Sequence, residues 1–177
     1  MAEKIVIKRK AFTIDIPLLN QNTEVLAVNQ EALIGRIIKL DLTRILRGKN
    51  LEATLIIKKE NDKIFADFVS VKLTPAYIGR MIRKNISYIE DSAVYPTKDG
   101  KITIKPYLLT RKKVYRSIRN SLRLKAIETI TEFVKDKTSG EVFSAILYGE
   151  LQKEIAAKLK KIYPITFSEI RIAKTKS

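Results

Sequence analysis

The sequence has 177 residues, a formal net charge of +16 and a hydrophobic content of 45%, so it can bury one substantial core and is too apolar to be a disordered basic tail. It contains neither cysteine nor histidine, which excludes disulfides, thiolate nucleophiles, Cys-based zinc sites and His-based catalysis. No apolar run approaches the roughly 20 residues that cross a bilayer, and the first residues lack the apolar core of a secretory signal, so we expect no membrane partner.

The first part of the chain predicts strands. Apolar and polar residues alternate in short segments that stop at turn residues such as Pro17 and the Asn61-Asp62-Lys63 turn. The expected strands cover residues 4–16, 23–28, 35–45, 51–59 and 64–73.

A helix is predicted to follow, over residues 75–90. Thr74 is a suitable N-cap, and Pro75 suits the first helical position. The apolar stripe of this helix is Ile78, Ile82, Ile86 and Ile89.

Residues 94–98 and 101–110 predict a β-hairpin. The Asp99-Gly100 pair between them is typical of a type I′ turn. Pro96 and Pro106 each lack a backbone donor, so part of the hairpin should lie at a sheet edge or a bulge.

The last third predicts two long helices and a final strand over residues 166–174. In the first helix, over residues 112–137, a basic face is expected from Lys112, Arg116, Arg119 and Arg123. Beyond residue 126 the apolar stripe moves to that same side, which indicates either packing over the second half of the helix or a break near residues 125–128. Thr138 and Glu141 fit a capping box that opens the second helix, which should end before Pro164.

This order of elements predicts an α+β fold with a curled antiparallel sheet or partial β-barrel and flanking long helices. We expect a single domain over residues 1–177, with a strand-rich part at 1–110, a helical part at 112–163 and the closing strand at 166–174.

The charge distribution is the main indication of function. Between Asp99 and Glu128 there are nine basic residues and no carboxylate: Lys101, Lys105, Arg111, Lys112, Lys113, Arg116, Arg119, Arg123 and Lys125. Like charges at this density repel one another unless a polyanion neutralises them, and the phosphates of nucleic acid are the obvious partner. A solvated surface is the weaker interpretation, because solubility is normally served by mixed signs.

Other patches are less distinctive. Lys8, Arg9 and Lys10 could contact phosphates or form a plain polar strand face, while Arg80, Arg83 and Lys84 lie in a stretch without carboxylates from residue 68 to 89. Tyr107 and Tyr115 could stack on bases. Packing is the stronger expectation for both tyrosines, because Tyr115 shares the apolar helix face and Tyr107 lies in a strand.

No catalytic constellation is present. The acids Asp91 and Asp99 have no basic or metal-like companion pattern in the sequence, and no glycine-rich phosphate loop is found. We therefore expect no enzyme activity, no metal and no cofactor.

Several motifs, in order, resemble those of a ribosomal protein family. They are Leu33-Ile34-Gly35-Arg36-Ile37; Phe68–Thr74 before the predicted helix; Thr97-Lys98-Asp99-Gly100 before Leu108–Lys113; Lys161-Ile162-Tyr163-Pro164; and Ile170-Arg171-Ile172-Ala173-Lys174. Together they resemble the archaeal and eukaryotic small-subunit family called S-three-a-e, or e-S-one, over residues 33–176.

The resemblance implies a barrel-like fold on the platform of the small ribosomal subunit in the cytoplasm. The implied partners are small-subunit ribosomal RNA near its 3′ end, neighbouring platform proteins and mRNA near the exit. Arg36, Arg171, Lys174 and Lys176 join the basic patches as expected RNA contacts. Two alternatives remain open: a non-ribosomal RNA-binding translation factor, and a scaffold whose basic surface binds an acidic protein.

Overall fold

Nine strands and four α-helices make up the part of the chain that the structure, a computed structural model, describes, namely residues 10–46, 48–60 and 63–176. The strands are β1 (Lys10–Ile16), β2 (Gln21–Ala27), β3 (Ile37–Asp41), β4 (Leu51–Glu60), β5 (Lys63–Leu73), β6 (Tyr88–Glu90), β7 (Ala93–Thr97), β8 (Gly100–Thr110) and β9 (Ile165–Lys176). The helices are α1 (Pro75–Met81), α2 (Arg116–Val134), α3 (Ser139–Tyr148) and α4 (Glu150–Lys160). The α+β class predicted from the sequence is confirmed.

The strand pairings form a mixed sheet with the order β2-β1-β5-β9-β8-β6, to which β3, β4 and β7 add as branches. The pairing of β1 with β5 is parallel, whereas β1–β2, β6–β8, β7–β8 and β8–β9 are antiparallel. The predicted curled antiparallel sheet or partial barrel is therefore wrong. Among the described residues the pairing path runs from β2 to β6, and these two end strands do not pair with each other, so the path does not close into a ring.

The chain divides into two units. The first comprises the described residues within Met1–Leu40 and Thr54–Val69, and the second comprises those within Asp41–Ala53 and Ser70–Ser177. Strands β3, β4 and β5 each contribute residues to both units. In the first unit, alternate residues of β1 and β4 are buried, such as Ile14, Ile16, Leu55 and Ile57. This alternation is the signature of a strand with one covered face.

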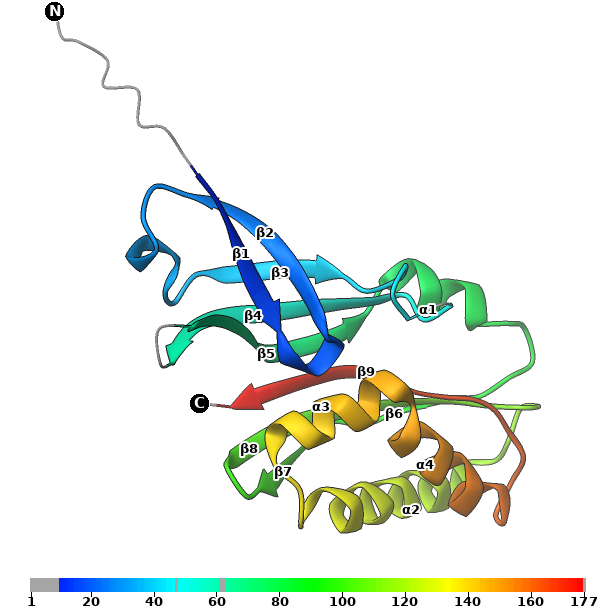
Figure 1. The fold of residues 1–177 in the computed structure, drawn as a ribbon. Coiled ribbons are helices and arrows are strands. Elements are labelled where there is room, and N and C mark those ends of the chain that lie inside the picture. The colour runs from blue at the N-terminus through cyan, green and yellow to red at the C-terminus, as the bar shows by residue number, and fades with distance from the viewer. Residues whose placement is uncertain (1–9, 47, 61–62, 177) are drawn as a thin grey trace, which may run out of the picture. The chain divides into compact units, whose positions relative to one another are not determined.

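The second unit is built around β8, which pairs with β6, β7 and β9. Helices α2, α3 and α4 pack against these strands (Figure 1). The side chains between helices and strands form the core of this unit, and include Ile102, Ile104, Ile130, Phe143, Leu151 and Ile155. Removing such side chains from water supplies the main driving force for packing the helices on the sheet.

Helix α1 is shorter than the sequence predicted, because it ends at Met81 instead of continuing to residue 90. Asn85 adopts a left-handed backbone conformation (φ 62°) that a continuing α-helix does not allow. Ile89, expected on the helical stripe, lies instead in β6, where it is buried and paired with Leu108. Pro75 does begin the helix, but the hydroxyl of Thr74 makes no capping hydrogen bond.

The predicted hairpin is confirmed as β7 and β8, joined at Lys98 and Asp99. The turn is not the predicted type I′, since that turn needs a positive φ at Asp99 and this residue does not have one. Pro96 lies in β7, whose described pairing is with β8 alone, and Pro106 lies at a register shift against β9. Both prolines therefore occupy the edge and bulge positions that their missing N–H predicts.

Helix α2 begins at Arg116, four residues later than predicted, and continues unbroken to Val134. The predicted alternative of a break near residues 125–128 is wrong. Ile130 and Val134 are fully buried, so the shift of the apolar stripe reflects packing over the second half of the helix. The capping box of Thr138 and Glu141 is confirmed.

The long helix expected after the capping box is two helices. Gly149 separates α3 from α4 with a φ of 80°, a left-handed conformation that glycine adopts without steric cost. The apolar periodicity runs on across this position and predicts one continuous helix, whereas Gly149 itself is a residue type that commonly ends helices. The final strand is confirmed as β9.

Candidate nucleic-acid interface

A groove of about 660 Å³ lies between the first turns of α2 and strand β6, within the second unit. Three arginines of α2, Arg116, Arg119 and Arg123, line it because residues three and four positions apart share a helix face. The opposite wall is formed by Tyr88, Ile89 and Glu90, and Ser117 and Asn120 complete the lining. We call this feature the α2–β6 groove.

Two of the three arginines in the groove are free to bind a ligand. Arg116 and Arg119 are exposed and have no ion pair with another described residue. Arg123 is different, since its Nε lies 2.8 Å from Asp91 Oδ2. This contact is an ion pair without hydrogen-bond geometry, because Asp91 Oδ2 accepts no hydrogen bond from a described residue.

The acidic wall residue of the groove is also paired. Glu90 forms an ion pair with Arg171 of β9. The carboxylates nearest the groove are therefore neutralised by Arg123 and Arg171, and Arg116 and Arg119 leave the groove with an excess of positive charge.

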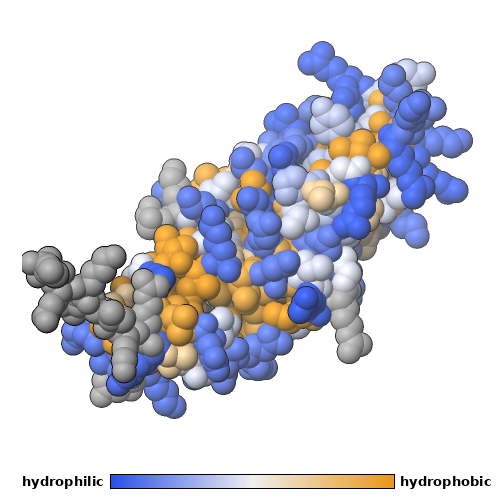
Figure 2. All heavy atoms as spheres, turned by 90° about the horizontal axis from the view of Figure 1, so that it is seen from above, coloured by the Kyte–Doolittle hydropathy of each residue, from blue (hydrophilic) through white to orange (hydrophobic). Residues whose placement is uncertain are grey.

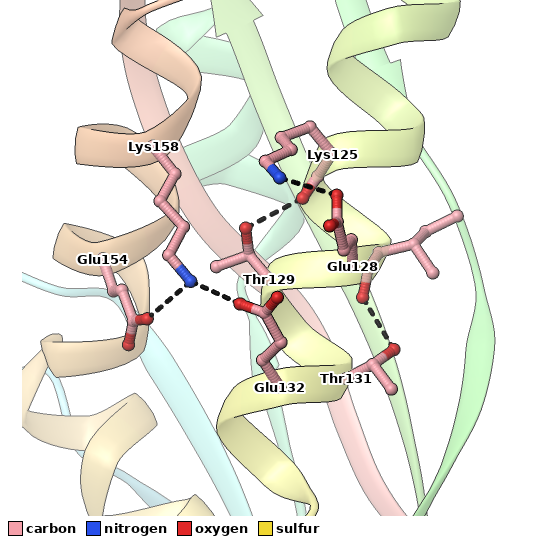
Figure 3. Close-up of polar contacts among 8 residues, drawn as sticks. Lys125, Glu128, Thr129, Thr131, Glu132, Glu154 and Lys158 are labelled. Atoms are coloured by element: carbon pink, nitrogen blue, oxygen red, sulfur yellow. Dashed lines mark hydrogen bonds and ion pairs between the residues drawn. The ribbon is translucent and has the colours of Figure 1, made fainter.

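The acids of α2 lie in its second half and are paired with lysines (Figure 3). Lys125 Nζ lies 2.7 Å from Glu128 Oε2. Lys158 of α4 bridges Glu132, at 2.6 Å, and Glu154, at 3.1 Å. Hydrogen bonding to Lys158 lowers the pKa of Glu132, and the two carboxylates raise the pKa of Lys158. Helix α2 is thus divided into a basic first half and a second half whose acids are engaged with lysines.

The start of α2 adds to the basic character of its first half. Lys112 and Lys113 are exposed just before the helix, so the prediction that Lys112 lies on the helical face is wrong. The N-cap residue Tyr115 makes no side-chain capping bond, and the first turn carries no acid. The positive end of the helix dipole is consequently not offset by a local carboxylate.

Two tyrosines near the groove are strongly exposed. Tyr115 has a relative exposure of 83% and Tyr88 one of 63%. The expectation that Tyr115 packs on the apolar helix face is therefore wrong, whereas Tyr107 is buried as expected. Exposed aromatic rings beside arginines can stack on unpaired bases.

A second cavity in the same unit, of about 350 Å³, lies between the segment after α1, the end of β8 and the start of β9. Its lining is mainly apolar, from Met81, Ile86, Leu109 and Phe167, with Thr110 and Thr166. Arg83 and Arg111 also line it, although they lie in separate basic patches of the sequence. We call this feature the Phe167 cavity.

The remaining predicted cations are distributed over both units. Arg80 places its guanidinium 5.9 Å from the centre of the Tyr77 ring, and Lys84 and Lys174 are exposed. In the first unit, Lys10 lines a hollow of about 430 Å³ together with Lys59, and Arg36 donates to the carbonyl of Leu26 at 3.2 Å. Lys8 and Arg9 lie outside the described residues, as does the side chain of Lys176.

The sequence reasoning missed the partners of the arginines. Asp91 was expected to have no basic companion, yet it pairs with Arg123, and Glu90 was not singled out at all. No local spacing could reveal these pairs, because the residues are distant in the chain and meet only through β6, α2 and β9.

The surface also exposes apolar side chains. In the first unit, Leu26, Val28, Ile34 and Ile37 are between 42% and 60% exposed. Figure 2 shows hydrophobic residues gathered among hydrophilic ones on the viewed face of the molecule. Where such residues form a contiguous patch, they mark contact with another protein more often than single exposed apolar residues do.

No helix in the described part of the chain is long and apolar enough to span a membrane. Nor do the described residues contain a group of three or more acidic side chains placed to hold a metal ion.

Comparison with known proteins gives a consistent result. Residues 7–177 match the model of the Ribosomal S3Ae family. The chain is 29% identical over 153 residues to the small ribosomal subunit protein eS1 of Halorubrum lacusprofundi, a match that covers 84% of this chain and 71% of that protein.

Two further archaeal relatives carry the same name. The eS1 protein of Saccharolobus islandicus is 30% identical over 120 residues, which covers 67% of this chain but only 58% of that protein. The eS1 protein of Haloarcula marismortui is 27% identical over 150 residues, covering 82% of this chain and 70% of that protein. The chain thus spans less than two thirds of the Saccharolobus protein.

Proposed function

The chain belongs to the Ribosomal S3Ae family, whose members are structural constituents of the small ribosomal subunit, and we propose that it binds ribosomal RNA there through the α2–β6 groove. Membership of a ribosomal protein family agrees with the expectation that the chain has no catalytic activity. The resemblance of its motifs to those of this family supports a position on the platform of the small subunit, near the mRNA exit and the 3′ end of the ribosomal RNA.

The observation that carries this proposal is that Arg116 and Arg119, which have no ion pair with another described residue, line a groove whose nearest carboxylates are paired with Arg123 and Arg171. Guanidinium groups bind phosphate oxygens through two parallel donors, and their binding releases condensed counterions. Lys112 and Lys113 extend the basic surface toward the start of α2. Recognition of the RNA backbone and its shape is favoured, with Tyr88 and Tyr115 available to stack on unpaired bases.

Contact with a neighbouring ribosomal protein is supported by a separate observation. Leu26, Val28, Ile34 and Ile37 of the first unit are exposed although they are large and apolar. The RNA-binding and protein-binding surfaces would then be supplied by different units of the chain.

Measuring RNA affinity against salt concentration tests the RNA contact. The probe is a transcript of the 3′ region of small-subunit ribosomal RNA, and the variant is Arg116→Gln with Arg119→Gln. Losing two phosphate contacts should reduce the slope of log affinity against log salt by roughly 1.4 to 1.8. The control is Lys153→Gln with Lys160→Gln, which removes the same charge from exposed positions of α4. Equal slopes for the two double variants would refute the groove as the binding site.

Sedimentation separates the ribosomal proposal from its rival. A structural constituent should migrate with small subunits in stoichiometric amounts after a salt wash. A translation factor would instead appear mainly in the free fractions of the gradient.

A further inference from the structure

The Phe167 cavity is not explained by phosphate binding in the α2–β6 groove, because most of its lining is apolar. Its volume of about 350 Å³ lies within the range of roughly 300 to 1,000 Å³ that is typical of sites for small organic groups. Met81, Ile86, Leu109 and Phe167 supply the apolar surface. A cavity of this volume and lining suits an occupant that is itself flat or apolar.

Two exposed arginines accompany this apolar lining. Arg83 and Arg111 have no ion pair with another described residue. They come from two stretches of sequence, residues 68–89 and 100–127, that contain no carboxylate. The cavity therefore combines an apolar interior with two cations that have no ion pair among the described residues. This combination suits a ligand that carries both a flat ring and a phosphate.

The walls of the cavity are held in place by hydrogen bonds. Thr110 Oγ1 accepts from Ser87 N at 3.0 Å, and Thr110 N donates to Ser87 O at 3.0 Å. Ser87 Oγ in turn accepts from Val114 N at 3.1 Å, and Arg111 N donates to the carbonyl of Pro164 at 3.2 Å. These bonds fix the segments that carry Ile86 and Arg111 relative to β8. The backbone of these walls is therefore preorganised, and an occupant would have to order only exposed side chains such as those of Arg83 and Arg111.

The aromatic wall is also fixed and partly accessible. Phe167 is half-buried, and its ring centroid lies 5.9 Å from that of Tyr77 and 6.4 Å from that of Tyr107. A register shift of β9 against β8 leaves Thr166 without a partner between Ile165 and Phe167, and the exposed Thr166 lines the cavity. The bulge thus presents a hydroxyl, which can donate or accept, beside an aromatic ring.

We propose that the Phe167 cavity receives one unstacked nucleobase of a single-stranded segment of RNA, whose flanking phosphates bind Arg83 and Arg111. This inference rests on the proposed function and makes it more specific, because it assigns a base-binding site separate from the α2–β6 groove. Single-stranded RNA is recognised in this way elsewhere, by bases that leave the stack and contact aromatic rings. An apolar side chain of a protein would not use the two cations.

The test compares single-stranded oligo-A with the oligo-A·oligo-U duplex, in which no base is free to enter the cavity. Thr166→Trp places a bulky ring at an exposed lining position, so it fills the cavity without removing core packing. It should weaken binding of oligo-A roughly 5- to 150-fold, the loss expected for one base–aromatic contact, and leave duplex affinity unchanged. Val94→Trp adds the same ring at an exposed position of β7 outside the cavity and should change neither affinity.

A second readout does not depend on affinity. Ultraviolet irradiation of the oligo-A complex should attach a nucleotide to the peptide that contains Phe167, and Thr166→Trp should abolish this adduct. Thermal unfolding of each variant confirms that it is folded.

The outcomes separate this inference from the proposed function. If Thr166→Trp leaves both affinities unchanged, or lowers both equally, the base-binding proposal is wrong. The remaining candidate occupant of the cavity is then an apolar side chain of another protein. The groove remains supported in that case as long as Arg116→Gln with Arg119→Gln reduces the salt slope. If the unaltered chain binds neither probe at low salt, both proposals fail.

Discussion

Arg123 Nε lies 2.8 Å from Asp91 Oδ2, so the third arginine of the basic helix face already has a partner within the chain. Arg116 and Arg119, which share its groove, have none among the described residues. Three arginines that look equivalent in the sequence should therefore behave differently when they are replaced.

The first prediction separates Arg116 from Arg123. Arg116→Gln should reduce the salt slope of RNA binding by roughly 0.7 to 0.9, and Arg123→Gln should reduce it less. Arg123→Gln should instead lower the free energy of unfolding by about 1 kcal/mol, because the largely buried Asp91 carboxylate loses its partner. Urea unfolding measures this loss, and adding Asp91→Asn should restore part of it. Equal effects of the two single variants on the salt slope would contradict this assignment.

The second prediction concerns Tyr115, whose ring is 83% exposed at the start of α2. Tyr115→Ala should leave the melting temperature unchanged, since the ring packs on little of the protein. It should weaken binding of single-stranded RNA by about 1 kcal/mol or more, whereas Tyr115→Phe should bind normally because the ring remains. A large fall in melting temperature with either variant would show that the ring has a structural role.

The third prediction is a dependence of stability on pH through Glu169. Burial raises the pKa of Glu169 above its ordinary value of 4.5, and the opposing effects of Lys49 and the Gln152 amide are smaller. The stability that this raised pKa provides is fully present below about pH 4.5 and is lost as the pH rises through the folded-state pKa. Glu169→Gln keeps an acceptor for Gln152 Nε2, which lies 3.0 Å from Glu169 Oε2.

Glu169→Gln should therefore be more stable than the unaltered protein near pH 7, and the difference should shrink as the pH falls toward 4. Urea unfolding at a series of pH values measures it. A stability gain that is constant with pH would exclude titration of Glu169 as the cause.

The fourth prediction tests the break between α3 and α4. Gly149 has a φ of 80°, and a Cβ at this position would lie 2.6 Å from Lys49 Nζ. Gly149→Ala should lower the free energy of unfolding by about 1 to 2 kcal/mol, the cost of a left-handed conformation in a residue with a side chain. Gly149→Asn should cost less, because asparagine adopts this conformation more readily. If alanine and asparagine cost the same, the close approach of Lys49 and not the backbone conformation causes most of the loss.

The fifth prediction tests the capping box at the start of α3. Thr138 Oγ1 accepts from Glu141 N at 3.3 Å, and Glu141 Oε2 accepts from Thr138 N at 2.8 Å. Thr138→Ala should lower the free energy of unfolding by about 1 kcal/mol. Thr138→Ser should retain most of the stability that the cap provides, because serine also caps helices well. Thr131→Ala, at an exposed threonine within α2, is the matched control and should not destabilise.

The stability that Glu141 contributes through the capping box should depend on pH in the opposite direction to the stability that Glu169 contributes. The hydrogen bond from Thr138 N lowers the pKa of Glu141 below its ordinary value of 4.5. Its contribution is therefore present above about pH 4.5 and is lost as the pH falls through the folded-state pKa. Glu141→Gln should retain the hydrogen bond and remove this dependence.

Features fixed by local chemistry could be predicted from the sequence. The Thr138–Glu141 box, the hairpin around Asp99 and the edge and bulge positions of Pro96 and Pro106 each depend on residues that are close in the chain. The basic character of α2 could also be predicted, because it needs only composition and helical spacing. The spacing does not show where the helix begins, so Lys112 was expected on a helix that starts only at Arg116.

Features fixed by tertiary contacts could not be predicted. Ile89 fits a helical stripe as well as a strand, and only its pairing with Leu108 decides between them. The apolar pattern that continues on both sides of Gly149 predicts one helix, and the glycine alone does not decide whether a helix ends there. The Phe167 cavity unites Arg83 with Arg111 because the hydrogen bonds of Ser87 and Thr110 bring their segments together. The mixed sheet follows from the pairing of β5, which is parallel with β1 and antiparallel with β9, and no local pattern records these partners because they are distant in the chain.

Strands β3, β4 and β5 each have residues in both units, and this limits the use of truncated forms of the protein. Because Asp41–Ala53 belongs to the second unit but lies between two stretches of the first, no single truncation can yield either unit whole. A fragment that stops at Val69 would carry Asp41–Ala53 without the rest of the second unit. A fragment that starts at Ser70 would lack Lys49, whose side chain lies close to Gly149. Deletion mapping would thus report misfolding where it was meant to report binding, and point substitutions on the intact chain are the sounder way to locate its contacts.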